Sequence, residues 1–263
     1  MRARMFYSVL VAVLFLSVIS CGSKDARVVW NDTLKKCSSN DLLGSKVLFF
    51  GASNNIGPGS VWRLRADGKY SPRWILPDAP IHNNNESTCG GDASASFTLS
   101  SGASLDNAIA PVTGSLGFDL KRARKVTLTP TKFRWDDVVE GPYENYIRTQ
   151  AKDDVKADLV PANKRFVLQR ALFITGLTAT FEFDSTTGLN VKGKVKEGAI
   201  PASDLGFNAD AKWEGNTKLT LSSKEGVYFV GELVPYNGGF AGGAPVFGAT
   251  VDASKARVVI REE

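Results

Sequence analysis

Alternating apolar and polar residues form the clearest pattern in the second half of the chain. Phe181 and Phe183 alternate with acidic residues, and Leu189 and Val191 alternate with lysines after a Thr-Thr-Gly turn. A period of two places successive side chains on opposite faces of a strand. The pattern therefore predicts a hairpin over 178–196, with one apolar face and one face on which carboxylates meet ammonium groups.

Further strands are expected along most of the chain. The alternation resumes between Phe207 and Trp213, and the Asp67-Gly68 pair is typical of a hairpin turn. Pro72 favours an edge position for the strand that contains it. The other apolar runs that predict strands lie at residues 46–50, 61–65, 70–76, 95–100, 116–120, 126–129, 166–174, 219–221, 227–234 and 258–260.

Helices are expected to be few. A short helix is predicted over 32–43 and a helical turn over 104–110. Asp136 and Asp137 suit the start of another helix through 143–149, because carboxylates are favourable near a helix N-terminus. Since strands outnumber helices, we expect a mostly β fold with minor α. Its antiparallel sheets would form a sandwich or an open barrel, with one or two short helices.

The composition is that of a folded protein. The chain has 263 residues, of which 43% are hydrophobic and 22% charged. It is long enough to bury a large core, as one all-β domain or as two smaller units. The largely polar segment 151–165 marks a possible weak boundary within a β-rich domain over 28–263. One histidine and three cysteines argue against a histidine-built zinc site, and we expect no metal ligands or cofactor.

The first twenty residues have the features of an export signal. Arg2 and Arg4 precede an apolar run over 9–19 that is short for a membrane span. The run ends in Val18-Ile19-Ser20-Cys21, which resembles the lipobox of bacterial lipoproteins. The resemblance implies that the Cys21 thiol takes a diacylglycerol and that cleavage removes residues 1–20. The alternatives are an ordinary secretory signal with a chance cysteine, or an uncleaved anchor.

The lipobox also predicts a location. Within the lipoprotein class, Gly22 in place of an aspartate favours the outer membrane, facing the periplasm, over the inner membrane. The tether over 21–27 is short, because six residues reach at most about 20 Å. Removing Arg2 and Arg4 lowers the formal charge of +5 by two. The remaining excess of basic residues favours contact with anionic lipid or with the cell wall, or it serves solubility alone. Export argues against nucleic acid as a partner.

Two cysteines remain once Cys21 is lipidated. Cys37 and Cys89 form an even pair in an oxidising compartment, which predicts one disulfide. Closing a loop of about 50 residues would contribute about 4 kcal/mol on the chain-entropy model. Two unpaired thiols are the alternative. A nucleophilic pair of Cys89 with His82 is disfavoured, because both residues lie in one polar, loop-like segment.

Aromatic and glycine-rich segments supply candidate contact residues. The glycine-rich stretch 238–248 could dip into a membrane or bind a partner, or it could be a packed or flexible loop. Tryptophans beside arginine suit sugar rings, lipid head groups or partner surfaces, although most large aromatic residues belong to the core. The candidate contact residues are Phe240, Val246, Phe247, Trp62 and Trp74.

Enzyme motifs are nearly absent from the chain. It lacks a Gly-x-Ser-x-Gly elbow, a Walker loop and a His-Glu-x-x-His motif, so no catalytic residues are assigned. We therefore expect a non-enzymatic, membrane-anchored envelope lipoprotein that binds another envelope protein, a lipid or a cell-wall component. One alternative is a carrier that holds a lipid or small apolar ligand in a β cavity. The other is a membrane-inserting or pore-forming subunit that uses the strands over 178–222.

Overall fold

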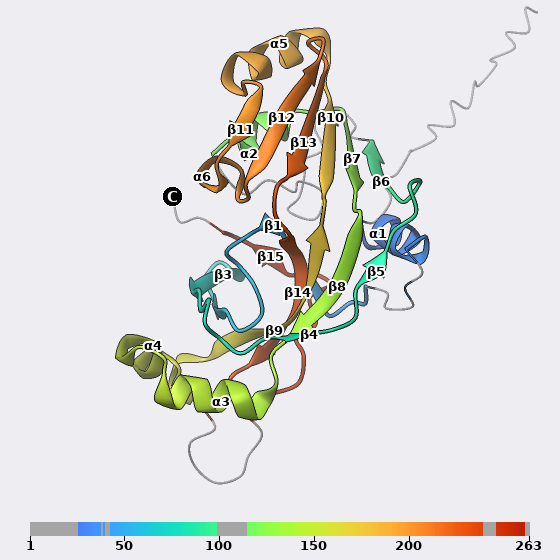
Figure 1. Ribbon diagram of the computed structural model, residues 1–263. Coiled ribbons are helices and arrows are strands. Elements are labelled where there is room, and N and C mark those ends of the chain that lie inside the picture. Colours follow the sequence, from blue (N-terminus) through green and yellow to red (C-terminus); the bar gives the residue numbers. More distant parts are fainter. Residues whose placement is uncertain (1–25, 38, 40–42, 99–114, 239–245, 261–263) are drawn as a thin grey trace, which may run out of the picture.

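The fold is mostly β with minor α, as the sequence predicts (Figure 1). The computed structural model describes residues 26–37, 39, 43–98, 115–238 and 246–260. The expected signal peptide, the lipobox and the helical turn at 104–110 lie outside the described residues. Within the described part, the strands form a nine-stranded sheet and a six-stranded sheet.

The larger sheet is organised around its longest strand, β9 (Arg165–Thr175). One edge of β9 pairs with β14 (Val227–Pro235). Its other edge pairs first with β2 (Val61–Leu64) and then, from Arg170 onward, with β8 (Lys132–Asp137). The remaining strands of this sheet are β1 (Val47–Ser53), β3 (Lys69–Trp74), β4 (His82–Asn83), β5 (Ser87–Thr88) and β15 (Arg257–Val258).

The smaller sheet is antiparallel throughout, in the order β11-β12-β13-β10-β7-β6. Four chain segments run from one sheet into the other, because β5 leads into β6, β7 into β8, β9 into β10 and β13 into β14 (Figure 1). Gly176, between β9 and β10, has a φ of +64°, a conformation that glycine adopts without strain. The strands of the smaller sheet are β6 (Ala95–Thr98), β7 (Lys125–Thr129), β10 (Thr178–Glu182), β11 (Gly198–Ile200), β12 (Ala209–Glu214) and β13 (Lys218–Ser223).

Helices cover the apolar faces of both sheets. Helix α1 (Ala26–Lys35) buries Trp30 and Leu34 in a core cluster that includes Phe181 and Phe229. Helices α3 (Glu140–Thr149) and α4 (Asp153–Asp158) lie together at one end of the larger sheet (Figure 1). The shorter helices are α2 (Gly117–Leu120), α5 (Ser185–Lys194), α6 (Ala202–Leu205) and the 3₁₀ turn η1 (Pro161–Asn163).

The predicted hairpin over 178–196 is wrong in its second half, because α5 follows β10 there. Asp184 caps α5 by accepting a 2.9 Å hydrogen bond from the amide of Thr187. Val191 and Val195 are buried, whereas Leu189 is 58% exposed. Residues four apart lie on one face of a helix. Val191 and Val195 therefore fit the buried side of a helix as well as they fit the alternation of a strand.

Other element boundaries differ from the sequence prediction. Residues 116–120, predicted as a strand, contain the short helix α2. Asp136 and Asp137 end strand β8, and the following helix begins only at Glu140. The first helix begins at Ala26, well before the predicted start at residue 32.

The segment 151–165 holds α4 and η1 and packs against the rest of the protein. Val155 and Leu159 are buried in a second core cluster that also contains Tyr143 of α3. The hydroxyl of Tyr143 donates a 2.9 Å hydrogen bond to the Gly59 carbonyl. This contact fixes α3 on the loop that precedes β2.

Candidate functional site

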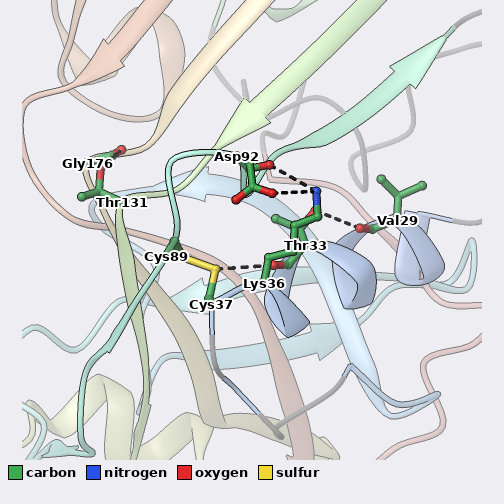
Figure 2. Close-up of a disulfide and its surroundings, with 8 residues drawn as sticks. All are labelled: Val29, Thr33, Lys36, Cys37, Cys89, Asp92, Thr131 and Gly176. Carbon is green, nitrogen blue, oxygen red and sulfur yellow. Dashed lines mark hydrogen bonds and ion pairs between the residues drawn. A yellow bond between two sulfur atoms is a disulfide. The ribbon is translucent and has the colours of Figure 1, made fainter.

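The predicted disulfide between Cys37 and Cys89 is present (Figure 2). Cys37 follows α1 and is fully buried, and Cys89 follows β5. The Cys89 amide donates a 2.9 Å hydrogen bond to the Thr131 carbonyl. The Thr131 hydroxyl in turn donates to the Gly176 carbonyl at 3.1 Å. The disulfide therefore attaches α1 to the place where the long strands pass between the two sheets.

An ion pair lies beside the disulfide (Figure 2). The Lys36 ammonium is 3.6 Å from the Asp92 carboxylate and donates to the Asp92 carbonyl at 3.3 Å. Both side chains are well exposed, so the pair adds little to stability. The covalent link joins α1 to the segment after β5.

A buried carboxylate lies at the end of β8. Asp136 has no exposed surface and accepts a 2.8 Å hydrogen bond from Arg134 Nε. It also accepts a 2.9 Å hydrogen bond from the Tyr228 hydroxyl on β14. The Arg134 guanidinium lies 4.3 Å from the centre of the Phe173 ring. Arginine and tyrosine donors together compensate the burial of this charge.

Tyr228 stays a neutral hydrogen-bond donor at physiological pH. Burial of the ring, followed by the negative charge of Asp136 and its hydrogen bond, raises the pKa of the Tyr228 phenol far above its ordinary value. A Cβ atom added at Gly57 would lie 2.7 Å from Tyr228 Cε2, so the ring packs closely against the Gly57 backbone.

A surface pocket of about 470 Å³ is located next to Tyr228. Ile75 and Ile81 contribute to its walls and are 41% and 36% exposed. Asn54 is held in place because its amide oxygen accepts from the Asn208 amide and its nitrogen donates to Glu225. The lining residues are Asn54, Asn55, Gly57, Pro58, Ser60, Ile75, Leu76, Pro77, Ile81 and Tyr228.

The pocket has a mixed apolar and polar lining. Its lining combines aliphatic and proline side chains with amide and hydroxyl groups, which is typical of ligand sites of this size. The only titratable side chain in the lining is Tyr228, whose raised pKa keeps its phenol protonated at neutral pH. Among the described residues, no group of three or more His, Cys, Asp or Glu side chains is placed to hold a metal ion.

Three predicted contact residues are buried in the structure. Trp62 is fully buried and donates a 3.0 Å hydrogen bond to the Ser60 hydroxyl. Val246 and Phe247 are 3% and 8% exposed, and the Phe247 ring lies 5.6 Å from that of Tyr143. These side chains fill the core, so they correct the prediction that they form a contact surface. Their apolar character fits either role, and the sequence carries no signal that separates the two.

The other two candidates differ. Trp74 is half-buried, with Arg73 5.0 Å above its ring and its indole nitrogen donating to Asp158 at 2.9 Å. Phe240 lies outside the described residues.

The sequence did not predict the pocket, because its walls come from segments that are far apart in the chain, near residues 54–60 and 75–81 and at Tyr228. The exposure of Ile75 and Ile81, which marks the pocket, is visible only in the fold.

The described residues contain no helix that is both long and apolar enough to cross a membrane.

No protein-family model and no curated protein sequence matches the chain. Among solved structures, the fold is similar to a bacterial gasdermin from Bradyrhizobium tropiciagri, with 12% identity and a TM-score of 0.44. The match covers 81% of this chain and 92% of that chain.

Proposed function

We propose that the chain is a lipid-anchored protein of the bacterial envelope, whose β-rich domain binds an envelope partner without catalysis. The lipobox ending at Cys21 supports the anchor, and the disulfide between Cys37 and Cys89 suits an oxidising compartment. Gly22 supports the outer membrane, facing the periplasm. Anchoring confines the domain to one layer and raises its effective concentration for partners in that layer.

The pocket beside Tyr228 carries the binding part of the proposal. Its aliphatic walls at Ile75 and Ile81 accept an apolar group, and the Asn55 amide at the rim offers a hydrogen bond. We expect the ligand group to be aliphatic with one polar end, on a partner protein or a lipid.

Cross-linking in cells tests this assignment. A photo-reactive residue at Ile81 should cross-link a partner, and Ile75→Ser in the same chain should reduce that yield several-fold. Leu189→Ser is the matched control, because Leu189 is an exposed leucine on α5, outside the pocket lining. If Ile75→Ser and Leu189→Ser leave the same cross-link yield, the pocket is not the binding site.

A carrier function is a second candidate, because the same apolar lining suits a free lipid. Native mass spectrometry of the full lipidated chain, released in mild detergent, separates the two. A second, non-covalent lipid mass that Ile75→Ser removes would favour the carrier. A chain without extra mass would favour the anchored binding protein.

A membrane-inserting function is a third candidate, favoured by the alternation along β12, where every second residue is exposed. Inserting 178–222 as extended hairpins would require α5 to unfold, which removes Val191 and Val195 from the core. Dye release from vesicles tests it. Release on adding the protein would support insertion, and intact vesicles would leave the anchored binding protein as the proposal.

A further inference from the structure

The start of α1 is fixed against two other segments of the domain. The Arg27 guanidinium donates hydrogen bonds to the carbonyls of Val47 at 2.7 Å and Ala253 at 3.2 Å. It also lies 5.6 Å from the centre of the Phe49 ring. The Ala253 amide donates to the Ser45 carbonyl at 3.0 Å, which joins the same two segments directly. These contacts attach the start of α1 to both segments.

Three cationic residues lie in the chain next to the segments that Arg27 joins. Lys46 precedes β1, and Lys255 and Arg257 belong to the segment that Arg27 contacts through Ala253. All three residues are exposed. We call Arg27, Lys46, Lys255 and Arg257 the basic face.

One carboxylate lies within the basic face. The backbone amide of Ser254 donates to Asp252 at 2.9 Å, and this bond, followed by the nearby charges of Arg27 and Lys255, lowers the pKa of Asp252. Asp252 therefore stays ionised and offsets one of the four cations. The basic face keeps a clear excess of positive charge at neutral pH.

The length of the tether decides what this face meets. Four residues lie between Cys21 and Ala26, so the start of α1 lies at most about 18 Å from the lipidated cysteine. Val28, on the first turn of α1, is 50% exposed and can enter the headgroup region. Basic side chains held close to an anionic bilayer are attracted to it within about one Debye length, near 8 Å at physiological salt.

We propose that the basic face docks on anionic phospholipid headgroups of the bilayer that holds the anchor, and so sets the orientation of the domain. This inference rests on the proposed lipid anchor at Cys21. The anchor alone leaves the domain free to rotate on its tether. Contact through Lys46, Lys255 and Arg257 restricts that rotation and presents a defined side of the domain to partners.

Lysine acylation of the full lipidated chain on vesicles tests the docking. One vesicle preparation contains phosphatidylcholine alone, and the other adds phosphatidylglycerol. We expect Lys46 and Lys255 to react several-fold more slowly on the anionic vesicles, and high salt to restore their reactivity. Exposed lysines elsewhere, Lys152 and Lys196, should react equally on both.

A pair of charge-matched variants completes the test. Docking should slow the hydrogen exchange of backbone amides near Val28 on the anionic vesicles relative to the neutral ones. The combined substitutions Lys46→Gln, Lys255→Gln and Arg257→Gln should abolish this difference. The control combines Lys152→Gln, Lys164→Gln and Lys196→Gln, which removes the same charge from other exposed positions and should leave the difference intact.

The outcomes separate docking from anchoring. Flotation in a density gradient shows whether the chain binds each vesicle type. If the chain floats with both types but Lys46 and Lys255 react equally on the two, the anchor stands and docking is wrong. If it floats only with anionic vesicles, the anchor is wrong and so is the proposed orientation on it, and the basic face alone binds anionic lipid. If it floats with neither, both proposals are wrong.

Discussion

The Tyr228 hydroxyl donates a 2.9 Å hydrogen bond to the carboxylate of Asp136, which has no exposed surface. The two residues come from β14 and β8, the strands on either side of β9. The bond therefore crosses a strand of the larger sheet. It also fixes the Tyr228 ring as a wall of the surface pocket.

Tyr228→Phe should lower the free energy of unfolding by about 1.5–3 kcal/mol, the range for a hydrogen bond to a charged group. The substitution leaves Asp136 with Arg134 as its donor and removes one compensating bond from a buried charge. Urea unfolding measures the change. Tyr70→Phe is the control, because the Tyr70 hydroxyl makes no hydrogen bond to another described residue, and it should cost much less. Equal losses in the two variants would contradict the role given to the bond.

Alkaline pH should destabilise the protein. Burial raises the pKa values of Tyr143 and Tyr228, with smaller contributions from Tyr236 and Tyr146 at Tyr143 and from Asp136 at Tyr228. Unfolded tyrosines ionise near about pH 10, so above that pH the unfolded state binds fewer protons than the folded state. The unfolding free energy should then fall with rising pH, by up to about 1.4 kcal/mol per pH unit for each tyrosine. Urea titrations across this range in wild type and Tyr228→Phe measure the slope, and an unchanged slope in the variant would refute the assignment.

Two glycines of α5 should respond in opposite directions to alanine. A Cβ at Gly188 would collide with the carbonyl oxygen of Asn216 in the β12–β13 turn, whereas a Cβ at Gly193 meets nothing within 4 Å. Gly188→Ala should lower the thermal midpoint, because α5 must move away from that turn. Gly193→Ala should raise stability by about 0.5–1 kcal/mol, since alanine is the better helix former. Thermal unfolding compares them, and stabilisation by both would show that α5 does not pack as described.

Removing the disulfide should cost about 2–4 kcal/mol of unfolding free energy. Cys37 and Cys89 are 52 residues apart in sequence, so the bond closes a large loop in the unfolded chain. The variant Cys37→Ser with Cys89→Ser, compared with oxidised wild type, measures the loss, and reduced wild type is the control. The variant and the reduced wild type should unfold at the same lower denaturant concentration. A variant as stable as the oxidised wild type would mean that the loop is held by its other contacts.

The sequence predicts the fold class and most strands, because local alternation reports directly on which face of a strand is buried. The run 166–174 corresponds closely to β9, and the Asp67-Gly68 turn joins β2 and β3. The pattern fails at α5, where the Asp184 cap decides for a helix although Val191 and Val195 also fit a strand. The pattern is wrong again at Asp136. It predicts the start of a helix there, whereas Asp136 is a buried residue of β8.

The pocket could not be predicted from spacing. Tyr228 reaches it from a strand that lies more than 140 residues beyond Ile81 in sequence. The burial of Trp62 and Phe247 was equally hidden, since large apolar side chains suit a core and a contact surface alike. Local patterns identify the elements, while tertiary packing decides which of their side chains remain accessible.

The N-terminal peptide of the protein purified from bacterial membranes gives the most direct test of the anchored account. Mass spectrometry should find a peptide that begins at Cys21 and carries a diacylglycerol on its thiol. The variant Cys21→Ser should lack this modification and leave the membrane fraction. A peptide that retains residues 1–20, or one that begins at an unmodified Cys21, would contradict the anchor on which the proposed function rests.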